Sequence, residues 1–172
     1  MKNFSSKDIK EYFYRNFTSV DGLWFVKIEE QYGFEKALEI DKEVWKVLPK
    51  IQARFIKSRL LAKSLPVSGN APETLFIEAV RIKMKLDNYK FRLSRKPGMI
   101  KAAVTHCPWH EIMVRSNRQS LSEKVGSAIC SAEYSVFASE FLKSFNLKIS
   151  SRICNGDKNC IFEFSINEVY PV

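Results

Sequence analysis

The chain has 172 residues, of which 45% are hydrophobic and 27% charged, and its formal net charge is +9. This length suits one packed domain, and this composition excludes an intrinsically disordered protein. The sequence contains no apolar run of the ~20 residues that a membrane-spanning helix needs, and its first residues lack the apolar core of a secretion signal. We therefore expect a cytoplasmic protein with reduced thiols, in which the four cysteines serve metal or substrate chemistry rather than disulfides.

The positive net charge raises the question of a nucleic-acid partner. The basic residues, however, recur at helical spacing, as in Lys42, Lys46 and Lys50, or alternate with apolar residues around Arg92. Such patterns are typical of the solvated faces of amphipathic elements, and no known nucleic-acid-binding motif accompanies them. We therefore expect no nucleic-acid partner.

The N-terminal part of the chain predicts helices. A short helix follows Ser5, with a serine available as N-cap, and a second helix spans Asp21–Tyr32 and ends at Gly33. Asp21 is the expected N-cap of the second helix. That helix is apolar nearly all round, which is typical of a buried helix.

Further helical patterns continue to residue 86. A long pattern covers Phe34–Leu65, and Pro49 should bend or split it. The residues 66–72 predict a loop, and a helix over Glu73–Leu86 follows.

The second half changes period. The pattern predicts a hairpin of strands, a short helix, a long helix and a final hairpin, over the ranges Tyr89–Ser94, Met99–His106, Pro108–Met113, Ser120–Phe145, Lys148–Ile153 and Ile161–Asn167. Small residues around Gly126 leave the long helix one slim side that can approach a neighbour closely. We expect a single α+β domain over residues 1–172, with an antiparallel sheet of about four strands packed against helices and an added helical N-terminal layer over residues 1–86.

Two cysteines flank the turn of the final hairpin. Cys154 and Cys160 stand at its two mouths, and the turn between them contains Gly156 and Asp157. Residues opposite each other on paired strands lie close enough to share a metal. In the strand alternation Cys160 lies on the apolar side, whereas Cys154 lies on the polar side.

The remaining donors could complete a zinc site. Cys130 and Glu133 are three residues apart on one helix and share a face. Together with the hairpin thiols they would form a tetrahedral zinc site, and Cys107 or His106 could supply or replace a ligand. The alternative is that the cysteines only fill the core, as free cysteines often do.

Cys107 allows a second kind of chemistry. It directly precedes the helix that Pro108 opens, where the positive end of the helix dipole lowers a thiol pKa. A nucleophilic thiol with His106 or His110 as its base would result. The alternative is a cysteine that ends a strand and packs beneath Trp109.

Two carboxylates lie in apolar helical patterns. Asp41 falls on the apolar stripe of its helix, and Glu29 lies in the almost wholly apolar second helix. A buried acid needs a partner, so each carboxylate belongs either to a structural ion pair or to a ligand contact.

The C-terminal pattern Cys154-x-Gly156-Asp157-x-x-Cys160-x-Phe162 resembles the C-terminal signature of the 4-vinyl reductase domain. That ligand-binding α/β fold is shared with phenol-sensing regulators and with transport-protein-particle subunits. The resemblance implies a hydrophobic small-molecule chamber beside a zinc ion that cysteines and an acidic residue bind. In those relatives the acidic residue lies in the strand, shortly before the second cysteine. In this chain the strand residues before Cys154 include no acid. Glu133 or Cys107 would therefore take that role.

Other parts of the chain resemble an uncharacterised prokaryotic family similar to the 2-amino-thiazoline-4-carboxylate hydrolase group. The resemblance rests on Val20–Phe25, on Glu29, Glu30, Gly33 and Phe34, on the pattern from Ala37 to Trp45, and on the Cys107-Pro108 pair.

These patterns lead to one expected function and one alternative. We expect a small-molecule-binding domain in which Asp41 or Glu29 orients a polar ligand group and aromatic residues wall an apolar chamber, namely Trp24, Trp45, Trp109, Tyr134 and Phe137. The alternative is a hydrolase of a small cyclic amide or thiazoline-type acid, in which Cys107, assisted by His106, or a zinc-bound water attacks. The expected partners are a hydrophobic or aromatic small molecule and, as an option, a second copy of the chain.

Overall fold

A computed structural model describes residues 4–62 and 71–166 of the chain. Most of the loop predicted at residues 66–72 lies outside the described residues. The chain divides into two compact units, residues 1–43 and residues 44–172. Within the described ranges, none of the helices combines the length and the apolar character that crossing a membrane requires.

The first unit contains α1 (Ser6–Tyr32) and most of α2 (Phe34–Val44). Ser5 caps α1 as predicted, because its Oγ accepts a hydrogen bond from the backbone N–H of Asp8 while the Asp8 carboxylate accepts one from the backbone N–H of Ser5. Gly33, at φ 83°, ends the helix, as the sequence predicts.

The prediction of two helices before Gly33 is wrong. Asp21 lies in the middle of one continuous helix and is not an N-cap. A single glycine, Gly22, costs a helix only about 1 kcal/mol, which the periodic residues on both sides of it offset. The expected burial is also wrong, since no residue of α1 is fully buried.

Helix α2 and helix α3 (Leu48–Ala62) occupy the long helical pattern. A three-residue turn separates them, and Pro49 lies in the first turn of α3, where a missing backbone N–H costs nothing. The predicted split of this pattern is therefore confirmed. Helix α4 (Pro72–Leu86) begins one residue earlier than predicted.

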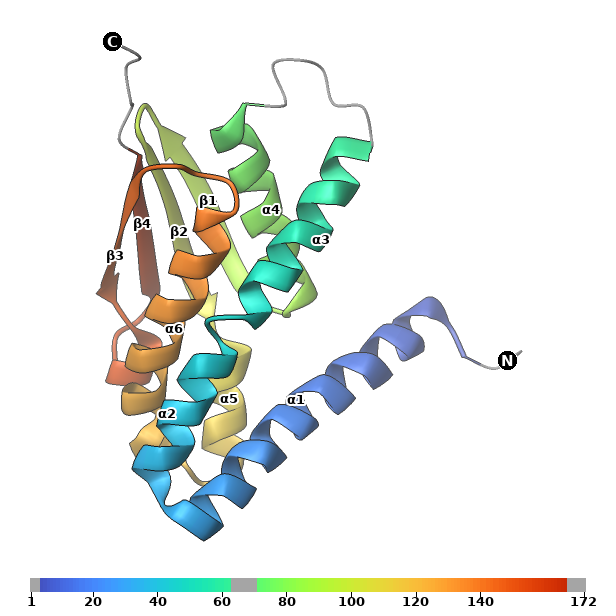
Figure 1. The fold of residues 1–172 in the computed structure, drawn as a ribbon, viewed down its shortest axis with the longest axis vertical. Helices are drawn as coiled ribbons and strands as arrows, with labels where there is room; N and C mark the ends of the chain where they lie inside the picture. The colour runs from blue at the N-terminus through green and yellow to red at the C-terminus, as the bar shows by residue number, and fades with distance from the viewer. Residues whose placement is uncertain (1–3, 63–70, 167–172) are drawn as a thin grey trace. The chain divides into compact units, whose positions relative to one another are not determined.

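The second unit contains a four-stranded antiparallel sheet, which confirms the α+β class (Figure 1). Its strands lie in the order β1-β2-β4-β3, so the central pairing of β2 with β4 joins two hairpins. The strands are β1 (Lys90–Lys96), β2 (Met99–His106), β3 (Phe145–Ser151) and β4 (Cys160–Ile166).

One face of this sheet carries the core. Along β2 every second residue is buried, at Ile100, Ala102 and Val104. Helix α4 contacts this face through Phe76, whose ring centre lies 4.9 Å from that of Phe164. Helix α6 (Ser122–Ser139) contacts the same face, and α3 lies against both α4 and α6 on the side away from the sheet. The core is therefore a sheet covered by two helices, with a third helix above them.

The predicted end of the long helix at Phe145 is wrong. Helix α6 ends at Ser139, and Phe145 begins β3, where it pairs with Ile166. The backbone carbonyl of Glu140 accepts a hydrogen bond from Lys57 of α3 at 2.7 Å, so a contact with another helix holds the chain where α6 ends. The pairing of Phe145 with Ile166 joins residues that are distant in sequence, so the local helical pattern does not indicate it.

Candidate functional site

The predicted site residues fall into both units. Trp24, Glu29 and Asp41 belong to the first unit, where Trp24 is 67% exposed rather than enclosed and the two carboxylates are half-buried. The other predicted residues all belong to the second unit; they are Trp45, His106, Cys107, Trp109, Cys130, Glu133, Tyr134, Phe137, Cys154 and Cys160.

A buried ion cluster joins α4 and α6 in the second unit. Lys83 of α4 is 2% exposed, and its Nζ lies 2.7 Å from a Glu133 carboxylate oxygen on α6. The same ammonium donates to Asp87 at 2.7 Å and to the side-chain oxygen of Gln52 at 3.0 Å. Burial alone lowers the pKa of Lys83, but the ion pairs with Glu133 and Asp87 outweigh it and raise the pKa above its usual value. Lys83 is therefore a charged group in the core.

Aromatic rings surround the Lys83 ammonium. It lies 5.9 Å from the ring centre of Tyr134 and 5.8 Å from that of Phe137, which is within the range of a cation–π contact. The Tyr134 ring also packs against Phe162 of β4 at 4.5 Å between centres. Both predicted chamber residues of α6, Tyr134 and Phe137, are thus fully buried.

The Tyr134 hydroxyl has no hydrogen-bond partner among the described residues. Burial, followed by the nearby Glu133 carboxylate, raises the pKa of Tyr134 well above its ordinary value, so the hydroxyl stays protonated. Most buried polar groups in proteins are hydrogen-bonded, which makes this hydroxyl an exception that requires a reason.

Lys83 is not among the residues that the sequence patterns indicate. A signal was present, because Lys83 lies on the apolar stripe of α4 beside Phe76, Val80 and Met84, all of them fully buried. A lysine at such a position predicts a buried carboxylate partner, and Glu133 is that partner.

The four cysteines are free thiols. Cys160 is buried, as the strand alternation predicts, and the other three are half-buried. Burial raises the pKa of all four, that of Cys107 to about 11 and that of Cys130 well above its ordinary value. Each thiol is therefore protonated at neutral pH.

Cys154 follows β3 at the turn, as predicted, so the strand alternation does not determine on which side its thiol lies. It belongs to the short 3-10 helix η3 (Ile153–Asn155), whose end is Gly156 at φ 86°. Its side chain lies so close to α6 that a Cβ atom on Gly126 would stand 2.8 Å from Sγ. The slim side of this helix, predicted from the sequence, makes that approach possible.

The donors of the predicted zinc site lie near one another, since beyond the effect of burial Glu133 and the other three thiols all raise the pKa of Cys130 electrostatically, but they are not arranged as metal ligands. Among the residues that the structure describes, no group of three histidine, cysteine, aspartate or glutamate side chains is placed to hold a metal ion. Glu133, the acid of this set, pairs with Lys83. The described arrangement does not fit a zinc ion, and zinc stays a prediction from the sequence pattern.

The surroundings of Cys107 do not favour a nucleophile. Cys107 precedes α5 (Pro108–Arg115) as predicted, but the burial of its thiol opposes the helix dipole and raises its pKa. His106 pairs with Glu111 at 3.2 Å between Nε2 and Oε2, and Nδ1 of His110 lies 2.7 Å from the Ser122 hydroxyl. Both candidate bases therefore have polar partners other than the thiol.

Two tryptophans predicted to wall the chamber meet in the second unit. The rings of Trp45 and Trp109 pack edge to face with 5.7 Å between their centres. Trp45 is buried and Trp109 half-buried. These two indoles could report on a ligand through their fluorescence.

The comparisons with known proteins give one family. No curated protein and no solved structure matches the chain. The model of the family of unknown function DUF6125 matches residues 4–166. Because this match spans almost the whole chain, the protein belongs to the DUF6125 family.

Proposed function

We propose that the protein binds a small molecule with an apolar or aromatic body and one polar group, and that this polar group hydrogen-bonds to the hydroxyl of Tyr134. The observation that carries the proposal is the buried Tyr134 hydroxyl without a partner among the described residues. Leaving a buried hydroxyl unsatisfied costs about 1–3 kcal/mol, which a ligand group would recover.

The surroundings of the hydroxyl support this class of ligand. The ring of Phe162 packs against the Tyr134 ring, and the ammonium of Lys83, which pairs with Glu133, lies 5.9 Å from the centre of the Tyr134 ring. Binding sites for small molecules combine many apolar and aromatic side chains with a few polar groups that orient the ligand. The resemblance of the C-terminal hairpin to a ligand-binding domain agrees with the same class. The alternative, a hydrolase that uses Cys107, receives less support because that thiol is protonated at neutral pH.

The test uses phenol, an aromatic molecule with one polar group, as the probe. Phenol should raise the thermal unfolding midpoint of the wild-type protein and change its tryptophan fluorescence in a saturable way. Tyr134→Phe should lose both responses. The matched control is Tyr12→Phe, which removes the hydroxyl of a tyrosine that is 60% exposed and should leave both responses unchanged.

A stability measurement separates binding from folding. Without phenol, Tyr134→Phe should change the free energy of unfolding by less than about 1 kcal/mol, because the hydroxyl that it removes has no partner. The absence of any response of the wild type to phenol, or an equal response of Tyr134→Phe, would overturn the proposal.

A further inference from the structure

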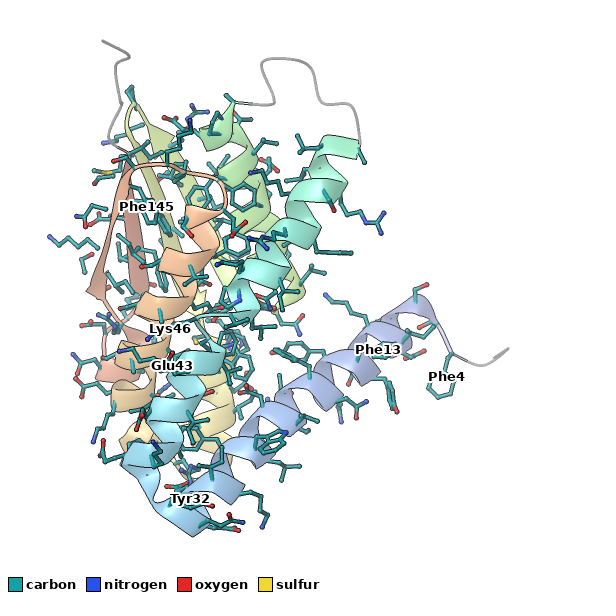
Figure 2. The ribbon with its side chains drawn as sticks, in the orientation of Figure 1. Phe4, Phe13, Tyr32, Glu43, Lys46 and Phe145 are labelled. Atoms are coloured by element: carbon teal, nitrogen blue, oxygen red, sulfur yellow. The ribbon has the colours of Figure 1, made fainter. Side chains whose placement is uncertain are left out.

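Helix α1 carries an apolar stripe that no other described part of the first unit covers. Six large apolar side chains share one side of the helix and are 37–67% exposed; they are Ile9, Tyr12, Phe13, Val20, Leu23 and Trp24 (Figure 2 labels Phe13). A second side of the helix is half-buried and includes Phe25, whose ring centre lies 5.7 Å from that of Phe34 on α2. A helix with apolar residues on both sides is normally covered on both.

The spacing of the stripe is that of a helix pair. The residues Ile9, Phe13, Asn16, Val20 and Leu23 follow one another at intervals of four, three, four and three residues. This is the heptad spacing by which two helices pack along one line. Asn16, the polar residue at the centre, is of the type that sets register in such pairs.

The charges of α1 differ between its two halves. Residues 6–19 contain three basic and two acidic residues, and residues 20–32 contain one basic and three acidic residues. An antiparallel pair of identical α1 helices would place the more basic half of one copy beside the more acidic half of the other, and it would also oppose the two helix dipoles.

We propose that α1 pairs antiparallel with α1 of a second copy of this chain, around a twofold axis at Asn16. Phe13 then packs against the partner's Val20, and Ile9 packs against the partner's Leu23. This pairing is self-complementary, as the interface of a twofold dimer must be. The interface is independent of the ligand proposed for the second unit.

The exposed surface of the stripe is large enough for such a dimer. A fully covered aromatic side chain buries roughly 150–250 Å², so the exposed parts of Tyr12, Phe13 and Trp24 would bury roughly 300–500 Å² per copy. With Ile9, Val20 and Leu23 added, the total approaches the ~800 Å² per partner of a stable interface.

The first test is the mass of the full chain in solution, measured by light scattering during size-exclusion chromatography. The wild type should be a dimer, and Leu23→Glu should be a monomer because it places a charge in the stripe. The matched control is Gly22→Glu, which adds the same carboxylate at the neighbouring position, where a Cβ meets no atom within 4 Å, and should remain a dimer. A monomeric wild type, or a dimer that survives Leu23→Glu, would overturn the proposal.

The second test is disulfide cross-linking, which reports orientation and does not depend on whether Leu23→Glu folds. Under mild oxidation, Asn16→Cys should form a cross-linked dimer because the two copies of this residue meet at the axis. Ile9→Cys should not, since its two copies would lie about 20 Å apart along an antiparallel pair. A mixture of Ile9→Cys and Leu23→Cys proteins should cross-link to each other, and the wild type measures the background from the native thiols. Equal self-cross-linking of Asn16→Cys and Ile9→Cys would show a parallel pair and overturn the antiparallel arrangement.

Discussion

Lys83 places a positive charge in the core of the second unit. Its ammonium is almost completely buried and lies within 3.0 Å of oxygens from Glu133, Asp87 and Gln52. A buried ion pair contributes little net stability compared with apolar residues of the same volume, but removal of one partner leaves the other charge buried and unpaired. The same pair explains why Glu133, which the sequence suggests as a metal ligand, has another role here.

Lys83→Met should therefore lower the free energy of unfolding by about 3–5 kcal/mol, because it leaves the Glu133 carboxylate in the core without its cation. The matched control is Lys85→Met, an exposed lysine of the same helix, which should change stability by less than about 0.5 kcal/mol. The double variant Lys83→Met/Glu133→Gln should be more stable than Lys83→Met alone. Urea denaturation measures all three, and equal losses for the two lysine variants would contradict the ion cluster.

The sequence predicts the bounds of a helix or strand correctly where the periodicity of its apolar residues matches their burial in the fold. The bounds of β2 are the predicted ones, because Ile100, Ala102 and Val104 alternate with less buried residues. The end of α6 was not predictable in this way, since Phe145 continues a helical pattern and is drawn into β3 by its pairing with Ile166. The contact of η3 with α6 likewise depends on residues distant in sequence, Cys154 and Gly126.

Gly126→Ala should destabilise the protein by about 1–3 kcal/mol, although alanine favours a helix, because its Cβ would lie 2.8 Å from the Cys154 sulfur. The control is Gly22→Ala in α1, where a Cβ meets no atom within 4 Å and alanine should stabilise by up to ~1 kcal/mol. Combining Gly126→Ala with Cys154→Ala should restore most of the loss. If Gly126→Ala stabilised the protein as Gly22→Ala does, the close approach of η3 to α6 would be refuted.

For the molecule as a whole, the buried thiols make the free energy of unfolding depend on pH in the alkaline range. In the folded chain the pKa values of the Cys107 and Cys130 thiols are raised above the ordinary value of 9.0, that of Cys107 to about 11. Both thiols therefore keep their protons at a higher pH than they would in the unfolded chain. The unfolded chain releases these protons at the lower pH, so it binds fewer protons than the folded chain in this range. Stability then falls as pH rises.

We expect the free energy of unfolding, as far as these thiols determine it, to be level below pH 9 and to fall between pH 9 and about 11, the range between the ordinary and the raised pKa of Cys107. Urea denaturation at a series of pH values measures this fall. Cys107→Ala should make it shallower, because that variant has one buried thiol fewer. A free energy of unfolding that rose through this range would show that the thiols are not buried as described.

Metal content and thiol accessibility also belong to the whole molecule. Since Glu133 pairs with Lys83 and the described donors form no group of three, we expect protein purified without added metal or chelator to contain much less than one zinc per chain. All four thiols should react with a thiol reagent after unfolding, and Cys107 should react slowly in the folded protein at neutral pH. About one zinc per chain with shielded thiols would uphold the zinc prediction instead. Elemental analysis and thiol titration on the same sample distinguish the two.

The fold class, most of the element order and the candidate thiols were predictable from the sequence, because these depend on local periodicity, on caps such as Ser5 and Gly33, and on residue type. Which of these groups lie in contact depends on the folding of the whole second unit. This folding placed Lys83 against Glu133, left the Tyr134 hydroxyl without a partner among the described residues, and set Cys154 against Gly126. These contacts join residues 28 to 50 positions apart in the chain, and no local pattern records such distances. The site chemistry therefore follows from packing, whereas the scaffold follows from the sequence pattern.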